Sequence, residues 1–270
     1  WDYHYENLDS RTILDRLAAV KYFVVKAGEE EYLPYGYDTL AAEVEKNDKL
    51  YRAYECKNAL PIGYTYDSYI PEEKYAKMST VEKQQALLQG VILSNSTVPE
   101  TTSEFNDREV PYKLVTGSGC REKDGKLIVT KENAQAKLVF DGLDECETYL
   151  ITEGVDYEAL SPRELISDKK WSKMTLYEQK KIQYENSTWR YWKESQKAYI
   201  DVTGQFLDKT ISIFTDKYNA YSGRSDFLCN TGYSVKRKKS ITLTFENTGV
   251  YSYKNMKVVC QPIENIESQT

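Results

Sequence analysis

The spacing of apolar residues near the start of the chain predicts a short helix. Ile13, Leu14 and Leu17 fall on one face at helical spacing, and Asp9 or Ser10 can serve as the N-terminal cap. This amphipathic pattern indicates a helix that packs its apolar face against the rest of the molecule.

Three β-rich runs follow within the first seventy positions. Residues 20–25 are apolar and β-branched apart from one lysine, which predicts a buried strand. Residues 50–56 and 60–66 are predicted to form two short strands on either side of a Lys-Asn-Ala turn.

A second helix is predicted over residues 79–92. Ser79 suits its N-cap, and Glu82 stands where the acid of a capping box belongs. Helices and strands therefore alternate through residues 1–108, which we interpret as a mixed α/β portion.

From residue 109 onward the pattern changes to short β-rich runs separated by Gly, Asn and Asp turns. Turns are also predicted at residues 230–232 and 247–249. This spacing predicts a β-sandwich over residues 109–270, of the jelly-roll, galactose-binding-like kind, and so an α+β chain. The predicted strands are residues 110–116, 126–130, 136–140, 147–152, 198–203, 210–215, 225–229, 240–245 and 250–259.

A different stretch, at about residues 156–197, separates the two groups of sandwich strands. We interpret it as a helical insertion that begins at residues 161–164, with a proline at the first helical position. It is rich in lysine and contains Trp171, Trp189 and Trp192. Three roles stay open: packing onto the sandwich, contact with a partner surface, or contact with an anionic membrane interface.

Charge and hydropathy exclude some classes of protein. The net charge of −6 and the pI of about 5.2 argue against nucleic acid as a partner, because phosphate binding needs a basic surface. Mean hydropathy is −0.66, and no apolar run approaches the length of a membrane span. Since the chain starts at Trp1, we expect it to be a piece of a longer protein.

Histidine and cysteine usage excludes most metal and nucleophilic chemistry. His4 is the single histidine, so a Ser-His-Asp or Cys-His system would have to use a residue at the chain start. The cysteines form no CxxC pair, and their odd number does not suit a disulfide framework. We expect buried free thiols, no metal and no cofactor. The five cysteines are Cys56, Cys120, Cys146, Cys229 and Cys260.

Two kinds of residue could serve a carbohydrate. Asp141 and Asp144 could form the carboxylate pair of a glycosidase, although ordinary turn acids are the simpler interpretation. Aromatic rings with hydroxyl tips suit stacking on sugars, and also suit a half-buried sheet surface. The candidate glycan-binding residues are Tyr64, Tyr66, Trp171, Trp189, Tyr191 and Trp192, of which the first two would share one face of a strand.

Several blocks of the sequence resemble one family. Residues 14–24 (LDRLAAVKYFV) and 54–64 (YECKNALPIGY) resemble signature blocks of the YfhO-type bacterial membrane proteins, and shorter likenesses occur at 83–88, 230–233 and 249–253. In the second block Cys56 stands where the family usually has asparagine, so that side chain cannot be essential to a shared function.

The resemblance implies an extracytoplasmic domain near the C-terminus of a polytopic membrane protein. Such proteins are similar to glycosyltransferases that use a polyprenyl-phosphate sugar and are associated with adding sugars to lipoteichoic acid. Their catalytic acid lies on an early loop, so no catalytic residue is carried over and we expect no transferase activity from this chain alone. The implied partners are a cell-envelope glycan or teichoic acid, the protein's own transmembrane helices and the membrane surface. The alternative is a structural or partner-docking domain.

Overall fold

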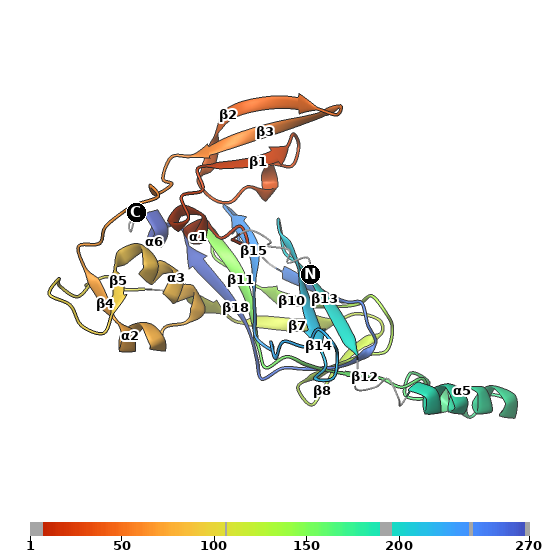
Figure 1. The fold of residues 1–270 in the computed structure, drawn as a ribbon. Helices are drawn as coiled ribbons and strands as arrows, with labels where there is room; N and C mark the ends of the chain where they lie inside the picture. Colours follow the sequence, from red (N-terminus) through yellow and green to blue (C-terminus); the bar gives the residue numbers. More distant parts are fainter. Residues whose placement is uncertain (1–7, 106, 190–195, 238–239, 268–270) are drawn as a thin grey trace.

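The computed structural model describes residues 8–105, 107–189, 196–237 and 240–267 of the chain (Figure 1). Most of the regular structure is β, arranged in several sheets, with short helices at one end and a helical arm at the other. This mixture agrees with the predicted α+β class.

The N-terminal sheet has the strand order β1-β3-β2, and its strands are antiparallel. It consists of β1 (Tyr22–Lys26), β2 (Tyr37–Lys46) and β3 (Lys49–Cys56), with the short 3-10 helix η1 (Glu30–Tyr32) between the first two. The expected strand at residues 20–25 exists, but its predicted burial is wrong. Val24 is 60% exposed and Val25 alone is buried, because β1 is an edge strand whose one face is left open.

The first helix, α1 (Thr12–Leu17), begins later than the sequence suggests. Its N-cap is Arg11, whose own side chain makes no capping hydrogen bond. Asp9 and Ser10 cannot take that role because their φ angles are 61° and 52°, in the left-handed region, whereas an N-cap is extended.

The helix predicted from Ser79 is confirmed as α3 (Thr80–Gln89) and has a complete capping box between Ser79 and Glu82. It ends before Gly90, so residues 91 and 92 belong to strand β5 (Val91–Leu93) instead. This strand runs parallel to β4 (Tyr69–Pro71), which is followed by helix α2 (Glu72–Lys77).

The strand predicted at residues 60–66 is wrong. Residues 57–68 form a loop between β3 and β4, and Ile62 at 96% exposure has nothing to pack against. Pro61 and Gly63 interrupt the run, since proline cannot donate to a sheet and glycine weakens a strand.

The portion predicted as a β-sandwich, which we call the sandwich for short, consists of three antiparallel sheets with the orders β14-β13-β16-β10-β7, β15-β11-β18-β6 and β12-β17-β9-β8. Apolar residues alternate along their strands and meet in one large buried core, which includes Leu138, Leu150, Val202, Ile241 and Val258. The jelly-roll, galactose-binding-like topology stays a prediction. The strands are β6 (Arg108–Val110), β7 (Tyr112–Thr116), β8 (Cys120–Lys123), β9 (Lys126–Val129), β10 (Ala134–Phe140), β11 (Cys146–Glu153), β12 (Asp156–Ala159), β13 (Lys197–Thr203), β14 (Asp208–Phe214), β15 (Phe227–Ser234), β16 (Ser240–Phe245), β17 (Gly249–Ser252) and β18 (Asn255–Pro262).

The turn predicted at residues 230–232 is wrong, because these residues continue strand β15. Glu147 pairs with Tyr233 while Tyr149 pairs with Asn230, so β15 carries one extra residue at this point. The result is a β-bulge, and Gly232 supplies the φ of +91° within it.

Both ends of the described chain meet at one place. Ile13 of α1 packs against Ile263 and Ile266, at the C-terminal helix α6 (Glu264–Glu267). The predicted domain boundary at residue 108 coincides with the start of β6, which pairs with β18. The division into domains itself stays a prediction.

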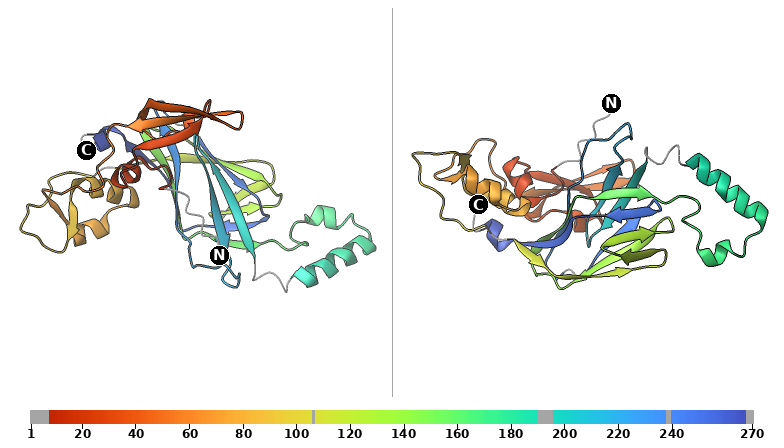
Figure 2. Two further views of the ribbon diagram at one scale, coloured as in Figure 1. Left: turned by 45° about the horizontal axis from the view of Figure 1, so that its top comes forward. Right: turned by 90° about the horizontal axis from the view of Figure 1, so that it is seen from below.

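Within the predicted insertion, the described residues 161–189 form an arm that projects from the far end of the sandwich (Figure 2). The predicted start of the insertion at residue 156 is too early, because residues 156–159 form strand β12, which pairs with β17. The arm contains α4 (Asp168–Trp171) and α5 (Leu176–Trp189), and α5 buries none of its side chains. The predicted helix start at residues 161–164 is wrong. Ser161 and Glu164 do exchange capping-type hydrogen bonds, but only a turn follows, and the first helix begins after Ser167.

Candidate functional site

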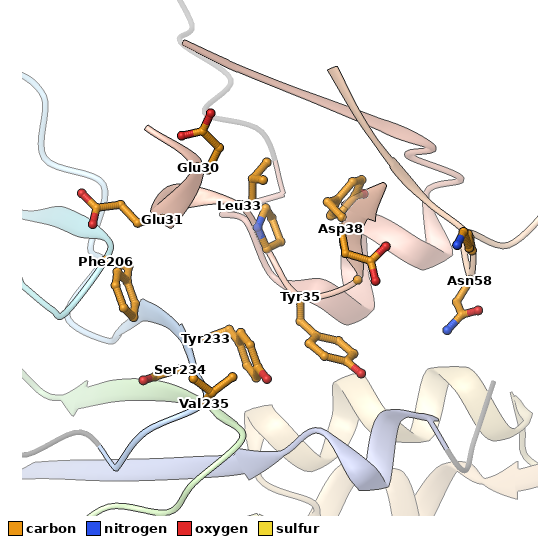
Figure 3. Close-up of a pocket in the computed structure, with 14 residues that line it drawn as sticks. Glu30, Glu31, Leu33, Tyr35, Asp38, Asn58, Phe206, Tyr233, Ser234 and Val235 are labelled. Atoms are coloured by element: carbon orange, nitrogen blue, oxygen red, sulfur yellow. The ribbon is translucent and has the colours of Figure 1, made fainter. Parts of the chain in front are cut away.

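A recess that combines aromatic and acidic side chains lies between the N-terminal sheet and the sandwich (Figure 3). Its volume is about 530 Å³, within the usual size of a small-ligand site. It is lined by Glu30, Glu31, Leu33, Pro34, Tyr35, Gly36, Tyr37, Asp38, Lys57, Asn58, Phe206, Tyr233, Ser234 and Val235. We call it the acidic-aromatic pocket.

Segments distant in the sequence supply the walls of the pocket. Helix η1 carries Glu30 and Glu31 on one side, and Tyr233, at the end of β15, lies with Val235, just after that strand, on the other (Figure 3). Asn58, just after β3, lies at the end near Asp38. The pocket therefore exists only because the N-terminal sheet stands over the sandwich.

Gly36 allows the wall to turn beneath Tyr35. Its φ is +90°, a conformation that side chains with a Cβ rarely adopt. A Cβ there would lie 3.4 Å from Cys56 Sγ and 3.5 Å from Arg16 Nη2, so the backbone is closely backed by both residues.

Aromatic side chains form the floor. The rings of Tyr35 and Tyr233 are 4.9 Å apart between centroids and tilted by 59°, which fixes each against the other. The guanidinium of Arg16 lies 5.9 Å from the centre of the Tyr35 ring. Phe206, from the loop between β13 and β14, adds a third ring.

The rim of the pocket is acidic. Glu30 is bound to Arg52 at 2.7 Å, and this hydrogen bond holds the pKa of Glu30 below its usual value. Asp38 accepts a hydrogen bond from the Thr39 hydroxyl at 3.0 Å. With Glu31 also at the rim, three carboxylates face one lining cation, Lys57.

These side chains suit a polyhydroxylated ligand. Flat rings can stack on the apolar face of a sugar, while carboxylates and an amide accept and donate hydrogen bonds to its hydroxyls. The excess of negative charge disfavours phosphate groups inside the pocket. In the described part of the chain, no cluster of three or more His, Cys, Asp or Glu residues could hold a metal ion.

The predicted pair Tyr64 and Tyr66 lies in the loop of residues 57–68, outside this pocket. The two rings meet edge to face at 5.5 Å between centroids, and the Tyr66 hydroxyl donates to the Leu87 carbonyl at 2.5 Å. Tyr66 thereby fastens the loop to α3, and glycan binding by this pair stays a prediction.

Trp171 and Trp189 lie in the arm, at the end of the molecule opposite the N-terminal sheet (Figure 2). Arg163 stacks over the Trp171 ring at 4.4 Å, and Trp189 packs against the edge of the sandwich core. Tyr191 and Trp192 lie outside the described residues. The structure thus separates Tyr64 and Tyr66 from Trp171 and Trp189.

The expected packing of the arm onto the sandwich is met by Trp189 but not by Leu176, Tyr177 and Tyr184 of α5. Leu176, Tyr177 and Tyr184 of α5 are 77%, 79% and 74% exposed. Their ring and alkyl surfaces face solvent because α5 projects outward from the sandwich.

The remaining predicted chemistry has simple structural roles. Asp141 and Asp144 are exposed and both bind Arg237, at 3.0 and 3.6 Å, as in a surface ion pair. All five cysteines are buried thiols outside any disulfide in the described chain, as predicted, and burial raises the pKa of the Cys120 thiol to about 11.

The sequence did contain a signal for the acidic-aromatic pocket. Arg16, Asn58 and Tyr233 each belong to one of the blocks that resemble the YfhO-type proteins, and the structure brings all three blocks to this place. The tyrosine-rich stretch at residues 32–37 supplies a further part of the pocket wall. Convergence of the blocks is a tertiary property, so residue types alone did not reveal it.

Comparison with known proteins points to the same family as these blocks. The family model described as "Bacterial membrane protein YfhO" matches residues 2–268. The chain belongs to the YfhO family. YfhO of Bacillus subtilis (strain 168), described as an uncharacterized protein, is 26% identical over 129 residues. That match covers 48% of this chain and 14% of the B. subtilis YfhO protein.

No solved structure matches this YfhO-family chain. Family membership indicates association with a bacterial membrane. Among the residues that the structure describes, no helix combines the length and apolar character needed to cross a bilayer.

Proposed function

We propose that the acidic-aromatic pocket binds a saccharide of the cell envelope and positions it as an acceptor for glycosyl transfer. Transfer itself would be catalysed by another part of the full-length family member, on the extracytoplasmic side of the membrane. The observation that carries this proposal is the meeting of Tyr35, Phe206 and Tyr233 with Asp38 and Asn58 in one recess.

The negative charge of the acidic-aromatic pocket restricts which chemical groups of a ligand can enter it. A teichoic acid offers both sugar or glycerol hydroxyls and phosphates, and carboxylates at the rim repel the phosphates. We therefore expect a lipoteichoic-acid-like acceptor to place a hydroxyl-bearing unit in the pocket and its phosphates outside. Neutral sugars are the simplest probes of this interaction.

Titration calorimetry with methyl glucoside, methyl N-acetylglucosaminide and poly(glycerol phosphate) tests the proposal. Replacing Asp38→Asn or Phe206→Ala should weaken sugar binding about tenfold, the effect of losing a charged hydrogen bond or a stacking surface. Asp48→Asn, in the turn between β2 and β3, is the matched control and should bind as the unmodified protein does. Equal affinity of all variants, or no binding of any of the three probes, would contradict the proposal.

The second candidate is a docking domain without glycan binding. The exposed Leu176, Tyr177 and Tyr184 of the arm favour it, because a monomeric surface rarely presents several large apolar residues on one projecting helix. Their exchange for serine would then abolish partner capture and leave sugar titrations unchanged.

A further inference from the structure

A second cavity, of about 320 Å³, opens beside strand β1. Its walls are apolar or aromatic with one exception, the carboxylate of Asp15. That residue is 3% exposed, so the cavity combines an apolar wall with one buried acid. The lining residues are Leu8, Asp15, Val20, Tyr22, Phe23 and Val24.

One oxygen of this acid lacks a partner. Among the described residues, nothing forms a hydrogen bond with Asp15 Oδ2. A buried polar atom without a partner costs free energy, so a group that supplied a proton or a positive charge would be stabilised there.

The two acids that act on Asp15, which are Asp9 and Glu147, are already engaged by other groups. Asp9 binds Arg11 at 3.1 Å and Lys209 at 2.6 Å. Glu147 accepts hydrogen bonds from Thr12. Burial, with these two acids nearby, raises the pKa of Asp15 to about 7. The local field therefore favours a cation that comes from outside this set.

The edge of β1 beside the cavity is open. Cys56 N–H donates to the Lys21 carbonyl, and Ala27 N–H donates to the Leu50 carbonyl. Backbone groups alternate in an antiparallel ladder, so those of Tyr22 and Val24 point away from β3. In the described sheet β1 pairs with β3 alone, and these outward groups have no strand beside them.

We propose that the β1 edge and this cavity bind an extended peptide segment that inserts a lysine or arginine side chain toward Asp15. An open strand edge offers N–H and C=O groups at a spacing that another extended backbone matches. The apolar walls suit the alkyl stem of the inserted side chain, and the acid suits its charged end.

An array of heptapeptides with Lys, Arg or norleucine at the central position tests the cavity. Norleucine has an unbranched alkyl side chain without the charge, so it isolates the contribution of Asp15. We expect Lys or Arg peptides to bind at least about tenfold more tightly than their norleucine counterparts. Asp15→Asn should remove this difference. No preference for the cation, or a preference that survives Asp15→Asn, would overturn the assignment of the cavity.

The variant Val24→Pro tests the strand edge. Proline removes the outward N–H of residue 24 and leaves the bonds between β1 and β3 in place. We expect loss of peptide binding in Val24→Pro and retention in the control Val24→Thr. Peptides methylated at alternate backbone nitrogens test the same contact without altering the protein.

If peptides still bind to Val24→Pro, and if methylated peptides still bind to the unmodified protein, the proposed pairing of the peptide with the edge of β1 is overturned. The peptide site is independent of the acidic-aromatic pocket, so Asp38→Asn should leave peptide affinity unchanged. Failure of sugar binding and failure of peptide binding are therefore distinguishable.

Discussion

Thr12 and Glu147, 135 residues apart in the sequence, are joined by two hydrogen bonds to one carboxylate oxygen. The backbone N–H of Thr12 lies 3.0 Å from Glu147 Oε1, and its hydroxyl lies 2.5 Å from the same atom. The Tyr149 hydroxyl donates to Oε2 of the same carboxylate at 2.6 Å. Because all three residues are buried, this network fastens α1 to strand β11 and holds the N-terminal sheet near the sandwich.

Replacing Thr12→Val should lower the free energy of unfolding by about 1–3 kcal/mol, because a buried carboxylate loses a donor that no water replaces. Urea denaturation measures the change. Thr65→Val, at an exposed position of the loop after β3, is the control and should stay within about 0.5 kcal/mol of the unmodified protein. Equal effects of the two substitutions would contradict the role of the network.

Stability should depend on pH through Asp15. Its pKa is raised to about 7 in the folded protein, against an ordinary value of 3.8 for this carboxyl group. The folded state therefore holds this proton more tightly, and its contribution is full below pH 3.8 and lost as pH rises toward 7. The variant Asp15→Asn cannot ionise at this position, so its free energy of unfolding should not fall in this way. Between pH 4 and pH 8 its free energy of unfolding should therefore rise by about 1–3 kcal/mol relative to that of the unmodified protein. A constant difference in the free energy of unfolding between the two proteins across that pH range would contradict the raised pKa of Asp15.

Gly204 is a site of close backbone contact. A Cβ there would lie 2.5 Å from Thr231 Cβ and 2.7 Å from the Thr231 carbonyl oxygen. Gly204→Ala should therefore cost at least about 2 kcal/mol, since strand β15 must shift away. Gly63→Ala, with nothing within 4 Å of the new atom, is the matched substitution and should cost little. Thermal unfolding of the two variants measures the difference in stability. Similar melting temperatures would show that β15 can shift at little cost in free energy.

Substituting one tyrosine of the core and one of the arm compares what the two regions contribute to stability. Tyr251 is 2% exposed, contacts Phe245 at 4.7 Å and donates to the Asn247 carbonyl at 2.7 Å. Tyr251→Ala should cost about 3–5 kcal/mol through the cavity it leaves. Tyr184→Ala, on the exposed face of α5, should change the free energy of unfolding by less than about 0.5 kcal/mol. A large loss in Tyr184→Ala would mean that the arm contributes to the fold.

Local signals predicted the strands of the sandwich well and the first portion poorly. Alternating runs such as residues 134–140 and 240–245 have their apolar side chains in the core, so period and burial agree. In contrast, β2 is exposed along most of its length and carries Ala, Glu and Lys, so no alternation marks it. The capping box at Ser79 was readable because both partners lie within one turn.

The positions of the functional residues were less predictable than the elements. Tyr233 was visible within a family-like block and Tyr35 within a tyrosine-rich stretch, but nothing local relates them. Their rings meet because the Thr12–Glu147 bonds and the contact of Ile13 with Ile263 bring the N-terminal portion to the end of β15. The tryptophans of the insertion drew attention by composition, and the structure places Trp171 and Trp189 on a separate arm.

The sequence by itself determined the class of fold, the strand-rich second portion, the free buried thiols and the family. Each of these depends on residue type, period or short blocks, which are local properties. The tertiary structure alone decided where the chemistry lies: the acidic-aromatic pocket, the open edge of β1 and the burial of Asp15. The pocket and the surroundings of Asp15 arise from contacts between segments more than a hundred residues apart, and the open edge of β1 follows from the strand order of its sheet.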